Sequence, residues 1–373
     1  MGLLGLPLLV TLVLVTVAAL AGGVWTWPRL AGRGPRMVLA RIGVLGACQL
    51  LLITTVMVAI NRHFAFYATW RELAGLGGGE VAVADEGGAG DGAAHGLVKL
   101  KPEFSLGDDP AEHGVIENVR IRGPVSGLAA DAYVYLPPQY FRQEERSHRF
   151  PVVLVLSGYP GALRNLVKRL QVPQKALEEI RAGRIRPAVY VMMRPTPAPP
   201  RDTECVDVPG GPQSRAYYAQ DVPEVIKAGY RVAAERGGWG VFGLSTGGHC
   251  ALKLAMLDPD AYSAAAAISG YYHAIQDVTT GDLYGGSRQV RNENDLLWRL
   301  RNRPAPPVSV LLTTSRVGER NRADTERFLK LVRPPMRASS IVLDSGGHNF
   351  DTWNRVLPPV LRWMSGRLTS QGQ

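Results

Sequence analysis

Two long apolar runs begin the chain, over residues 3–24 and about residues 38–60. The first contains no charged side chain, and each is long enough to cross about 30 Å of hydrocarbon as an α-helix. For the first run a cleaved signal peptide is the alternative, because residues 19–21 (Ala-Leu-Ala) offer a small-residue cleavage site. No Lys or Arg precedes that run, however, as a signal peptide would require. The pattern therefore predicts a membrane anchor over residues 1–75 with two transmembrane helices.

Residues 76–100 are rich in glycine, alanine and acidic side chains. Such a segment buries little apolar surface, and its composition is typical of a flexible tether. We therefore expect a flexible linker over residues 76–100 and a large folded domain over residues 101–373.

In the large domain, short apolar runs alternate with helical patterns. This alternation is typical of an α/β protein in which helices cover both faces of a mostly parallel sheet. An antiparallel pair of strands is expected first, at residues 114–122 and 130–136. Further strands are expected at residues 152–156, 188–193, 239–244, 264–269, 308–314 and 340–343. One helix is expected to end near residue 180, and further helices are expected at residues 246–257, 325–332 and 350–368.

The formal net charge of the chain is +10, and its distribution points to a membrane. Residues 1–75 contain six arginines and a single acid, and three of these arginines lie between the two expected spans. By the positive-inside rule this connection is cytoplasmic, so the large domain is expected outside the cytoplasm. Arg62 and Arg71, after the second span, act against this orientation. The other basic residues are dispersed, without the clustered basic and aromatic side chains of a nucleic-acid surface, so no nucleic acid is expected as a partner.

The strongest chemical signal is Gly243-Leu244-Ser245-Thr246-Gly247, which fits the pattern G-x-S-x-G. An apolar strand precedes it and a helical pattern follows, which is the context of a nucleophilic serine on a sharp strand-to-helix turn. Glycine two residues to either side lets such a turn close, and the helix N-terminus offers backbone amides to a developing negative charge. We therefore predict that Ser245 is a nucleophile.

A second glycine pattern lies just before the first, because residues 238–243 match G-x-G-x-x-G. A dinucleotide site needs its glycines between a strand and a helix, whereas these lie within the expected strand. We therefore do not expect a dinucleotide at this position.

A nucleophilic serine needs a histidine to accept its proton and an acid to orient that histidine, in the chain order Ser, acid, His. His348 lies in a glycine-containing loop before the closing helix and is the predicted base. His273 is not favoured, because it follows too closely on the strand expected at residues 264–269. Glu319, on the loop after strand 308–314, is the favoured acid. Asp324 in the next helix is the alternative, and Asp344 is a third candidate.

Two backbone amides are expected to bind the oxyanion. One belongs to Thr246, directly after the nucleophile, and the other lies in the loop after strand 152–156, where Tyr159 is the candidate donor. Cys205 and Cys250 both fall in the large domain, where an oxidising compartment would allow a disulfide between them. Two free thiols are the alternative.

Several of these motifs together resemble the putative esterase family, which includes S-formylglutathione hydrolases and secreted mycolyltransferases. The resemblance covers roughly residues 115–363 and implies an α/β-hydrolase fold, an acyl-enzyme on Ser245, and neither metal nor cofactor. Mycolyltransferases use a glutamate as the acid, which supports Glu319. The motifs that carry the resemblance are Gly158-Tyr159, the elbow Gly-Leu-Ser-Thr-Gly-Gly, Ser269-Gly270-Tyr271-Tyr272, and Gly346-Gly347-His348 with Trp353 five residues later.

The expected function is that of a membrane-anchored, extracytoplasmic serine esterase acting on a small-molecule, lipid or sugar ester. An acyltransferase that acylates a cell-envelope sugar or lipid is the first alternative, although mycolyltransferases lack the two spans expected here. The second alternative is a hydrolase-fold protein that only binds its ligand.

Overall fold

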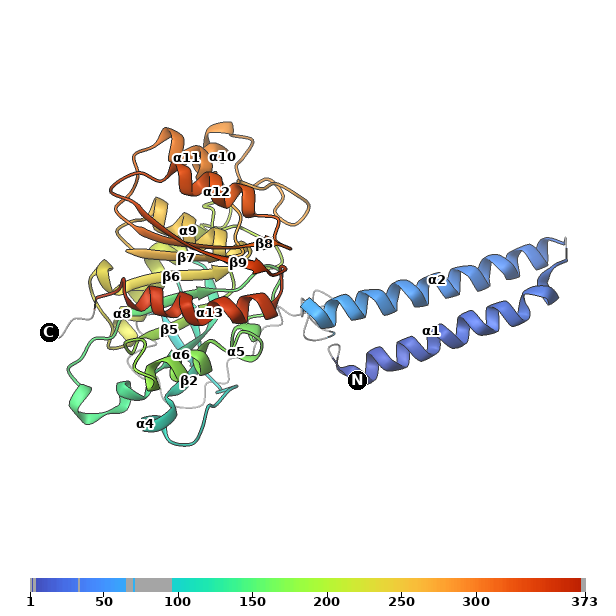
Figure 1. Cartoon of the computed structure of the whole chain (residues 1–373), viewed down its shortest axis with the longest axis horizontal. Coiled ribbons are helices and arrows are strands. Elements are labelled where there is room, and N and C mark those ends of the chain that lie inside the picture. The colour runs from blue at the N-terminus through green and yellow to red at the C-terminus, as the bar shows by residue number, and fades with distance from the viewer. Residues whose placement is uncertain (1, 3–4, 33, 65–69, 71–95, 370–373) are drawn as a thin grey trace. The chain divides into compact units, whose positions relative to one another are not determined.

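The computed structural model describes residues 2, 5–32, 34–64, 70 and 96–369. The chain divides into two compact units, residues 1–82 and residues 83–373 (Figure 1). Most of the expected linker, residues 76–100, lies outside the described residues.

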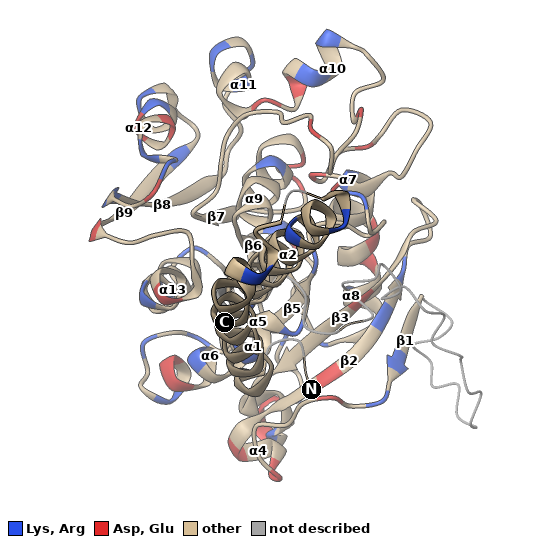
Figure 2. Ribbon diagram, turned by 90° about the vertical axis from the view of Figure 1, so that its right-hand side faces the viewer, with Lys and Arg blue, Asp and Glu red and all other residues tan. Residues whose placement is uncertain are grey.

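The first unit is a pair of helices, α1 (Leu6–Thr26) and α2 (Pro35–Phe64), joined through a short 3-10 turn, η1 (Trp27–Leu30). By length and composition, both helices could cross a membrane. A signal sequence near the N-terminus has the same length and apolar character. No residue of α1 is charged, and its ribbon is tan in Figure 2. The hydroxyls of Thr16 and Thr55 lie 2.9 Å apart, so a polar contact joins the two helices, as is common between helices in membranes.

The second unit is built on a sheet of nine strands in the order β1-β2-β3-β5-β4-β6-β7-β8-β9, within the described residues. Strands β1, β2, β3 and β5 pair antiparallel, and every pair from β5 through β4 to β9 is parallel. The prediction of a mostly parallel α/β sheet opened by an antiparallel pair is therefore confirmed. The strands are β1 (Leu97–Leu100), β2 (Val115–Arg122), β3 (Ala129–Leu136), β4 (Val152–Leu156), β5 (Val189–Met193), β6 (Trp239–Leu244), β7 (Ala264–Ile268), β8 (Ser309–Val317) and β9 (Arg337–Ser345).

Helices cover both faces of this sheet (Figure 1). Apolar side chains of α6 (Val172–Arg181) and α13 (Phe350–Ser365) form one core with one face of the sheet. The opposite core contains side chains from α8 (Val222–Gly229), α9 (Thr246–Leu257), α11 (Leu296–Asn302) and α12 (Arg322–Leu331). The shorter helical elements are α4 (Pro110–His113), η3 (Pro138–Phe141), η4 (Gln143–Glu145), α5 (Asn165–Lys168), α7 (Ser214–Ala216), the π-helix η5 (Tyr217–Asp221), η6 (Arg236–Gly238) and α10 (Arg288–Glu293).

Some boundaries differ from the pattern-based expectation. Strand β1 begins at Leu97, inside the segment expected to be linker, because its four residues gain order by pairing with β2. Strands β8 and β9 run beyond their apolar centres, since the polar residues at their ends still pair in register, for example Ser309 with Arg337. A pattern of apolar residues does not detect such ends.

A buried carboxylate joins two helices on one face of the sheet. Glu179 of α6 accepts two hydrogen bonds from Arg184, at 2.8 and 2.9 Å, and two from Arg362 of α13, at 2.7 and 3.0 Å. The hydrogen bonds from Arg184, followed by those from Arg362, lower the pKa of Glu179 to about 2. Because this value lies below the ordinary value of 4.5, acid favours the unfolded chain, and the stabilisation is lost as the pH falls from about 4.5 to about 2.

We predict that Glu179→Gln lowers the free energy of unfolding by about 2 kcal/mol at pH 7, because hydrogen bonds to charged groups are lost. The difference from wild type should vanish as the pH approaches 2, as measured by urea denaturation. Glu178→Gln is the matched control, since its exposed pair with Lys175 should be worth less than about 1 kcal/mol. Equal losses in the two variants would contradict the assignment.

Candidate active site

Ser245 occupies the turn between β6 and α9. All six residues of β6 are buried, and so are nearly all of α9, whereas Ser245 between them is partly exposed. Its φ of 54° lies in the left-handed region, which residues other than glycine rarely adopt. Its amide donates to the carbonyl oxygen of Ile268 at 2.9 Å, which holds the turn against the end of β7.

The two glycines of the turn are required by close backbone contacts. A β-carbon on Gly243 would stand 2.3 Å from the carbonyl carbon and oxygen of Gly247. A β-carbon on Gly247 would stand 2.3 Å from the carbonyl oxygen of Ser157. Since the obstructing atoms belong to the backbone, a side chain at either position would displace the turn.

Glu319 and His348 face each other on the loops that follow β8 and β9. The Oε2 atom of Glu319 lies 3.7 Å from Nδ1 of His348. The Glu319 side chain is only 3% exposed, whereas the His348 side chain is 48% exposed. A buried acid thus lies beside one ring nitrogen of a histidine whose side chain is about half exposed.

Two further side chains support this pair. The Ser269 hydroxyl, at the end of β7, donates a short hydrogen bond to Oε1 of Glu319 and accepts one from the Trp353 indole at 3.0 Å. The Trp353 ring also meets His348 edge-on, with 5.2 Å between ring centroids. Trp353 thus contacts the histidine directly and the acid through Ser269. Ser269 and Trp353 each belong to a motif that carries the family resemblance, but neither was predicted to act in the site.

The topology brings these residues to one edge of the sheet. Ser245, Ser269, Glu319 and His348 follow β6, β7, β8 and β9, which are neighbouring parallel strands. The carboxyl ends of such strands meet at one edge, where open α/β sheets bind their ligands. Within the described residues, Ser245 and His348 are not directly hydrogen-bonded, and catalytic hydrogen bonds often tighten only when substrate is bound.

The alternative acids make other contacts. Asp324 lies 3.6 Å from Nε2 of His273 and pairs with Arg327 at 2.9 Å. Asp344 is almost fully exposed and pairs with Arg316 at 3.3 Å. Of the three candidates, Glu319 is therefore the acid that faces His348.

The candidate oxyanion donors border the nucleophile. Thr246 is the first residue of α9, so its amide has no acceptor within the helix. Loop residue Gly158 approaches so closely that a β-carbon there would lie 3.4 Å from Cβ of Ser245. Tyr159 follows directly, and its side-chain hydroxyl is bound to the carbonyl oxygen of Pro200.

A disulfide links Cys205 to Cys250, with 5.5 Å between their Cα atoms. Cys250 belongs to α9, and Cys205 belongs to the long connection after β5. The bond therefore ties that connection to the helix that begins after Ser245. Cys48 of α2 is a free cysteine.

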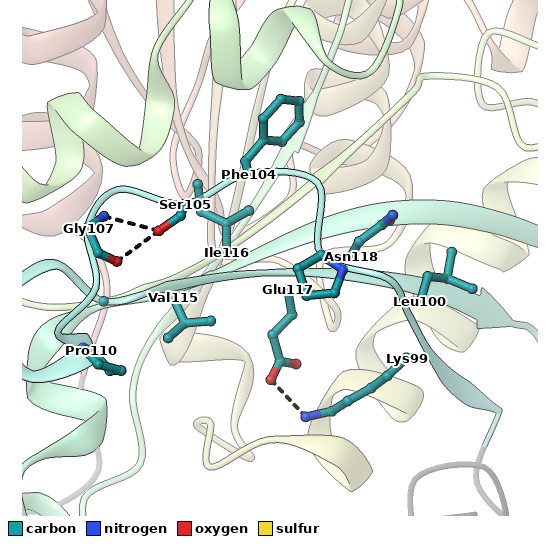
Figure 3. Close-up of a pocket in the computed structure, with 12 residues that line it drawn as sticks. Lys99, Leu100, Phe104, Ser105, Gly107, Pro110, Val115, Ile116, Glu117 and Asn118 are labelled. Atoms are coloured by element: carbon teal, nitrogen blue, oxygen red, sulfur yellow. Dashed lines mark hydrogen bonds and ion pairs between the residues drawn. The ribbon is translucent and has the colours of Figure 1, made fainter. Parts of the chain in front are cut away.

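A separate pocket of about 290 Å³ lies beside β1 and the amino-terminal half of β2 (Figure 3). Phe104 and Ile116 line it, together with the ion pair between Lys99 and Glu117, whose atoms are 2.7 Å apart. The candidate catalytic residues follow the carboxyl ends of the strands and do not line this pocket. In the part of the chain that the structure describes, no group of three or more His, Cys, Asp or Glu side chains is arranged to hold a metal ion.

Comparison with known proteins gives a consistent result. The model of the family described as "Putative esterase" matches residues 127–364. An uncharacterized protein of Corynebacterium glutamicum is 28% identical over 276 residues, which are 69% of this chain. The aligned part spans 63% of the length of that relative.

Solved structures share the fold at low sequence identity. An S-formylglutathione hydrolase from Agrobacterium tumefaciens is 17% identical, with a TM-score of 0.59 over 71% of this chain and 99% of that chain. A ferulic acid esterase is 19% identical, with a TM-score of 0.56 over 68% and 98% of the two chains. A fluorophosphonate-binding serine hydrolase of Staphylococcus aureus is 15% identical, with a TM-score of 0.53 over 67% and 98%.

The family model covers more than half of the chain, and the similar structures share its sheet and helices. The expected resemblance and fold are thus confirmed. The chain belongs to the Putative esterase family and has the α/β-hydrolase fold.

Proposed function

We propose that this protein is a serine esterase that cleaves carboxylic esters through an acyl-enzyme on Ser245. His348 is the general base, Glu319 orients it, and the amides of Thr246 and Tyr159 bind the oxyanion. The observation that carries the proposal is the positive φ of Ser245 on a glycine-flanked turn between a buried strand and a helix. Strained backbone of this kind is concentrated at functional sites.

The geometry supports a two-step reaction. His348 takes the proton of the Ser245 hydroxyl as the oxygen attacks the ester carbonyl, and the negative charge moves to the carbonyl oxygen between the two amides. Collapse of this intermediate breaks the ester C–O bond, and His348 returns the proton to the departing alcohol. In the second step His348 takes a proton from water as the water oxygen attacks the acyl carbon. The bond between the acyl carbon and Oγ of Ser245 then breaks, and His348 returns the proton to Oγ, which releases the acid and regenerates the hydroxyl.

The position of the Glu319 carboxylate, 3.7 Å from Nδ1 of His348, supports its role in orienting the imidazole. With Nδ1 directed at the carboxylate, the other ring nitrogen is left to accept the serine proton. The carboxylate also stabilises the imidazolium ion that forms as the proton is transferred. Ser269 donates a hydrogen bond to Glu319 in turn, so the carboxylate that faces His348 is held in place.

We further propose that α1 and α2 anchor the protein in a membrane and that the large domain lies outside the cytoplasm. The length and apolar character of both helices support anchoring, and the arginines between them support the orientation. The disulfide between Cys205 and Cys250 suits an oxidising compartment. The substrate is then an ester that reaches the outer side of the membrane.

Ser245→Ala should lower kcat/KM for a short-chain p-nitrophenyl ester by at least about a thousandfold, because the nucleophile is removed. Hydrolysis is followed by release of nitrophenolate, with the circular dichroism spectrum as the control for folding. Wild-type turnover by a folded Ser245→Ala variant would exclude Ser245 from the mechanism.

Two matched pairs of variants test the base and the acid. His348→Gln and Glu319→Gln should each lower kcat by at least about a hundredfold. His273→Gln and Asp324→Asn, which break the neighbouring His–Asp contact, should leave kcat within about threefold of wild type. Losses in the second pair that match those in the first would instead favour the dyad of His273 and Asp324.

Ser269→Ala should lower kcat by about tenfold, because Glu319 loses the hydroxyl that fixes it. In metal sites, groups that orient the ligands contribute about tenfold to a hundredfold, and we expect the lower end of that range for a group that orients the acid. Trp353→Phe keeps an aromatic ring but removes the indole donor to Ser269, so it should act in the same direction. If both variants keep the wild-type kcat, Ser269 does not orient the acid.

A further inference from the structure

Four of the five non-glycine residues with positive φ in the described part of the chain lie near the candidate site. Besides Ser245 and Ser269 they are Glu204, with φ 45°, and Cys205, with φ 52°. Such conformations cost about 1–3 kcal/mol and persist only where the surroundings enforce them. The catalytic steps above give Glu204 no role.

Three contacts fix the backbone around Glu204, and two of them come from the helix that follows the nucleophile. Its neighbour Cys205 is bonded to Cys250 of α9. Lys253, also on α9, donates from Nζ to the carbonyl oxygen of Glu204 at 2.8 Å. The amide of Glu204 donates to the Asp202 carboxylate at 3.0 Å. Glu204 is thereby held at a constant position relative to α9.

The Glu204 side chain is buried and receives two tyrosine hydroxyls. The residue is 1% exposed, and its Oε1 atom accepts a hydrogen bond from Tyr271 at 2.5 Å. The Tyr284 hydroxyl donates to the carbonyl oxygen of Ile275 at 3.0 Å and lies 3.5 Å from Oε2 of Glu204. Burial raises the pKa of Glu204, and the charge of Lys253 opposes this rise.

Tyr271 connects this carboxylate to the nucleophile turn. Its hydroxyl lies 3.5 Å from Oγ1 of Thr246. Its ring stacks on His249 of α9 with 4.5 Å between centroids, and its carbonyl oxygen lies 3.0 Å from Nδ1 of the same histidine. The ring and the backbone of Tyr271 are therefore fixed independently of its hydroxyl, and this hydroxyl bridges Glu204 and Thr246.

We propose that Glu204 is a positioning residue for the oxyanion site and that it acts through the Tyr271 hydroxyl on Thr246. An oxyanion donor is effective only when it is held in advance at the place where the charge develops. The first turn of α9 has no side-chain cap, and the contact from Tyr271 restrains its first residue instead. The proposal rests on the function given above, because it requires Ser245 to form a tetrahedral intermediate beside Thr246.

The two tyrosines provide a matched test in the full-length protein. Tyr271→Phe keeps the stacked ring and removes the hydroxyl, so kcat for a p-nitrophenyl ester should fall about tenfold with KM within about twofold of wild type. This loss is smaller than the roughly 10²–10³-fold expected when a donor is removed outright. Tyr284→Phe removes the other hydroxyl near Glu204, has no contact with Thr246 in the described residues, and should leave kcat within about twofold.

A second measurement separates oxyanion binding from general loosening. A trifluoromethyl ketone forms a hemiketal whose oxyanion occupies the same site, so its inhibition constant should rise in Tyr271→Phe by the same factor by which kcat/KM falls. Glu204→Gln should also lower kcat in the wild-type background but add less than about twofold to Tyr271→Phe, because residues that act in series are not additive. If Glu204→Gln does not fold, the comparison of the two tyrosine variants decides the question.

Wild-type kcat and inhibitor affinity in Tyr271→Phe would overturn the proposal, and so would equal losses in Tyr271→Phe and Tyr284→Phe. Either result, with fluorophosphonate still labelling Ser245 in the wild type, would leave the proposed esterase mechanism standing. A wild-type protein that is active but unlabelled at Ser245 would instead remove that mechanism, and the role of Glu204 with it.

Discussion

The backbone packing of the turn between β6 and α9 is the constraint on which the rest of the site depends. Gly243, Gly247 and the carbonyl oxygen of Ser157 approach so closely that no side chain fits between them. This packing holds Ser245 at a positive φ, a conformation that costs about 1–3 kcal/mol. The buried strand and helix on either side stabilise the turn, so Ser245 stays partly exposed at the edge of the sheet.

The parallel strands beside β6 then determine which other side chains reach that edge. Each of β7, β8 and β9 ends in a loop that supplies one member of the set Ser269, Glu319 and His348. Their contacts form a chain in which Trp353 binds Ser269, Ser269 binds Glu319, and Glu319 contacts His348. The buried Glu319 can orient the partly exposed His348 because Ser269 holds the Glu319 carboxylate in place.

The sequence predicted those parts of the site that depend on local pattern. The expected ranges of the strand before Ser245 and the helix after it match β6 and α9, because a continuous apolar run, a glycine-flanked serine and a helical pattern lie next to one another in the chain. The pairing of Glu319 rather than Asp324 with His348 was favoured from its place on the loop after β8. Ser269 and Glu204 were not predicted as parts of the site, since their contacts join residues far apart in sequence and leave no periodic signal.

We propose that the hydroxyl of Ser245 is the activated nucleophile of the large domain. The most direct test is the intact mass of the purified protein after reaction with a fluorophosphonate, followed by peptide mapping of the adduct. A single adduct is expected, located on Ser245 and reduced or absent in His348→Gln. An adduct on another residue, or an active esterase that forms no adduct at Ser245, would contradict it.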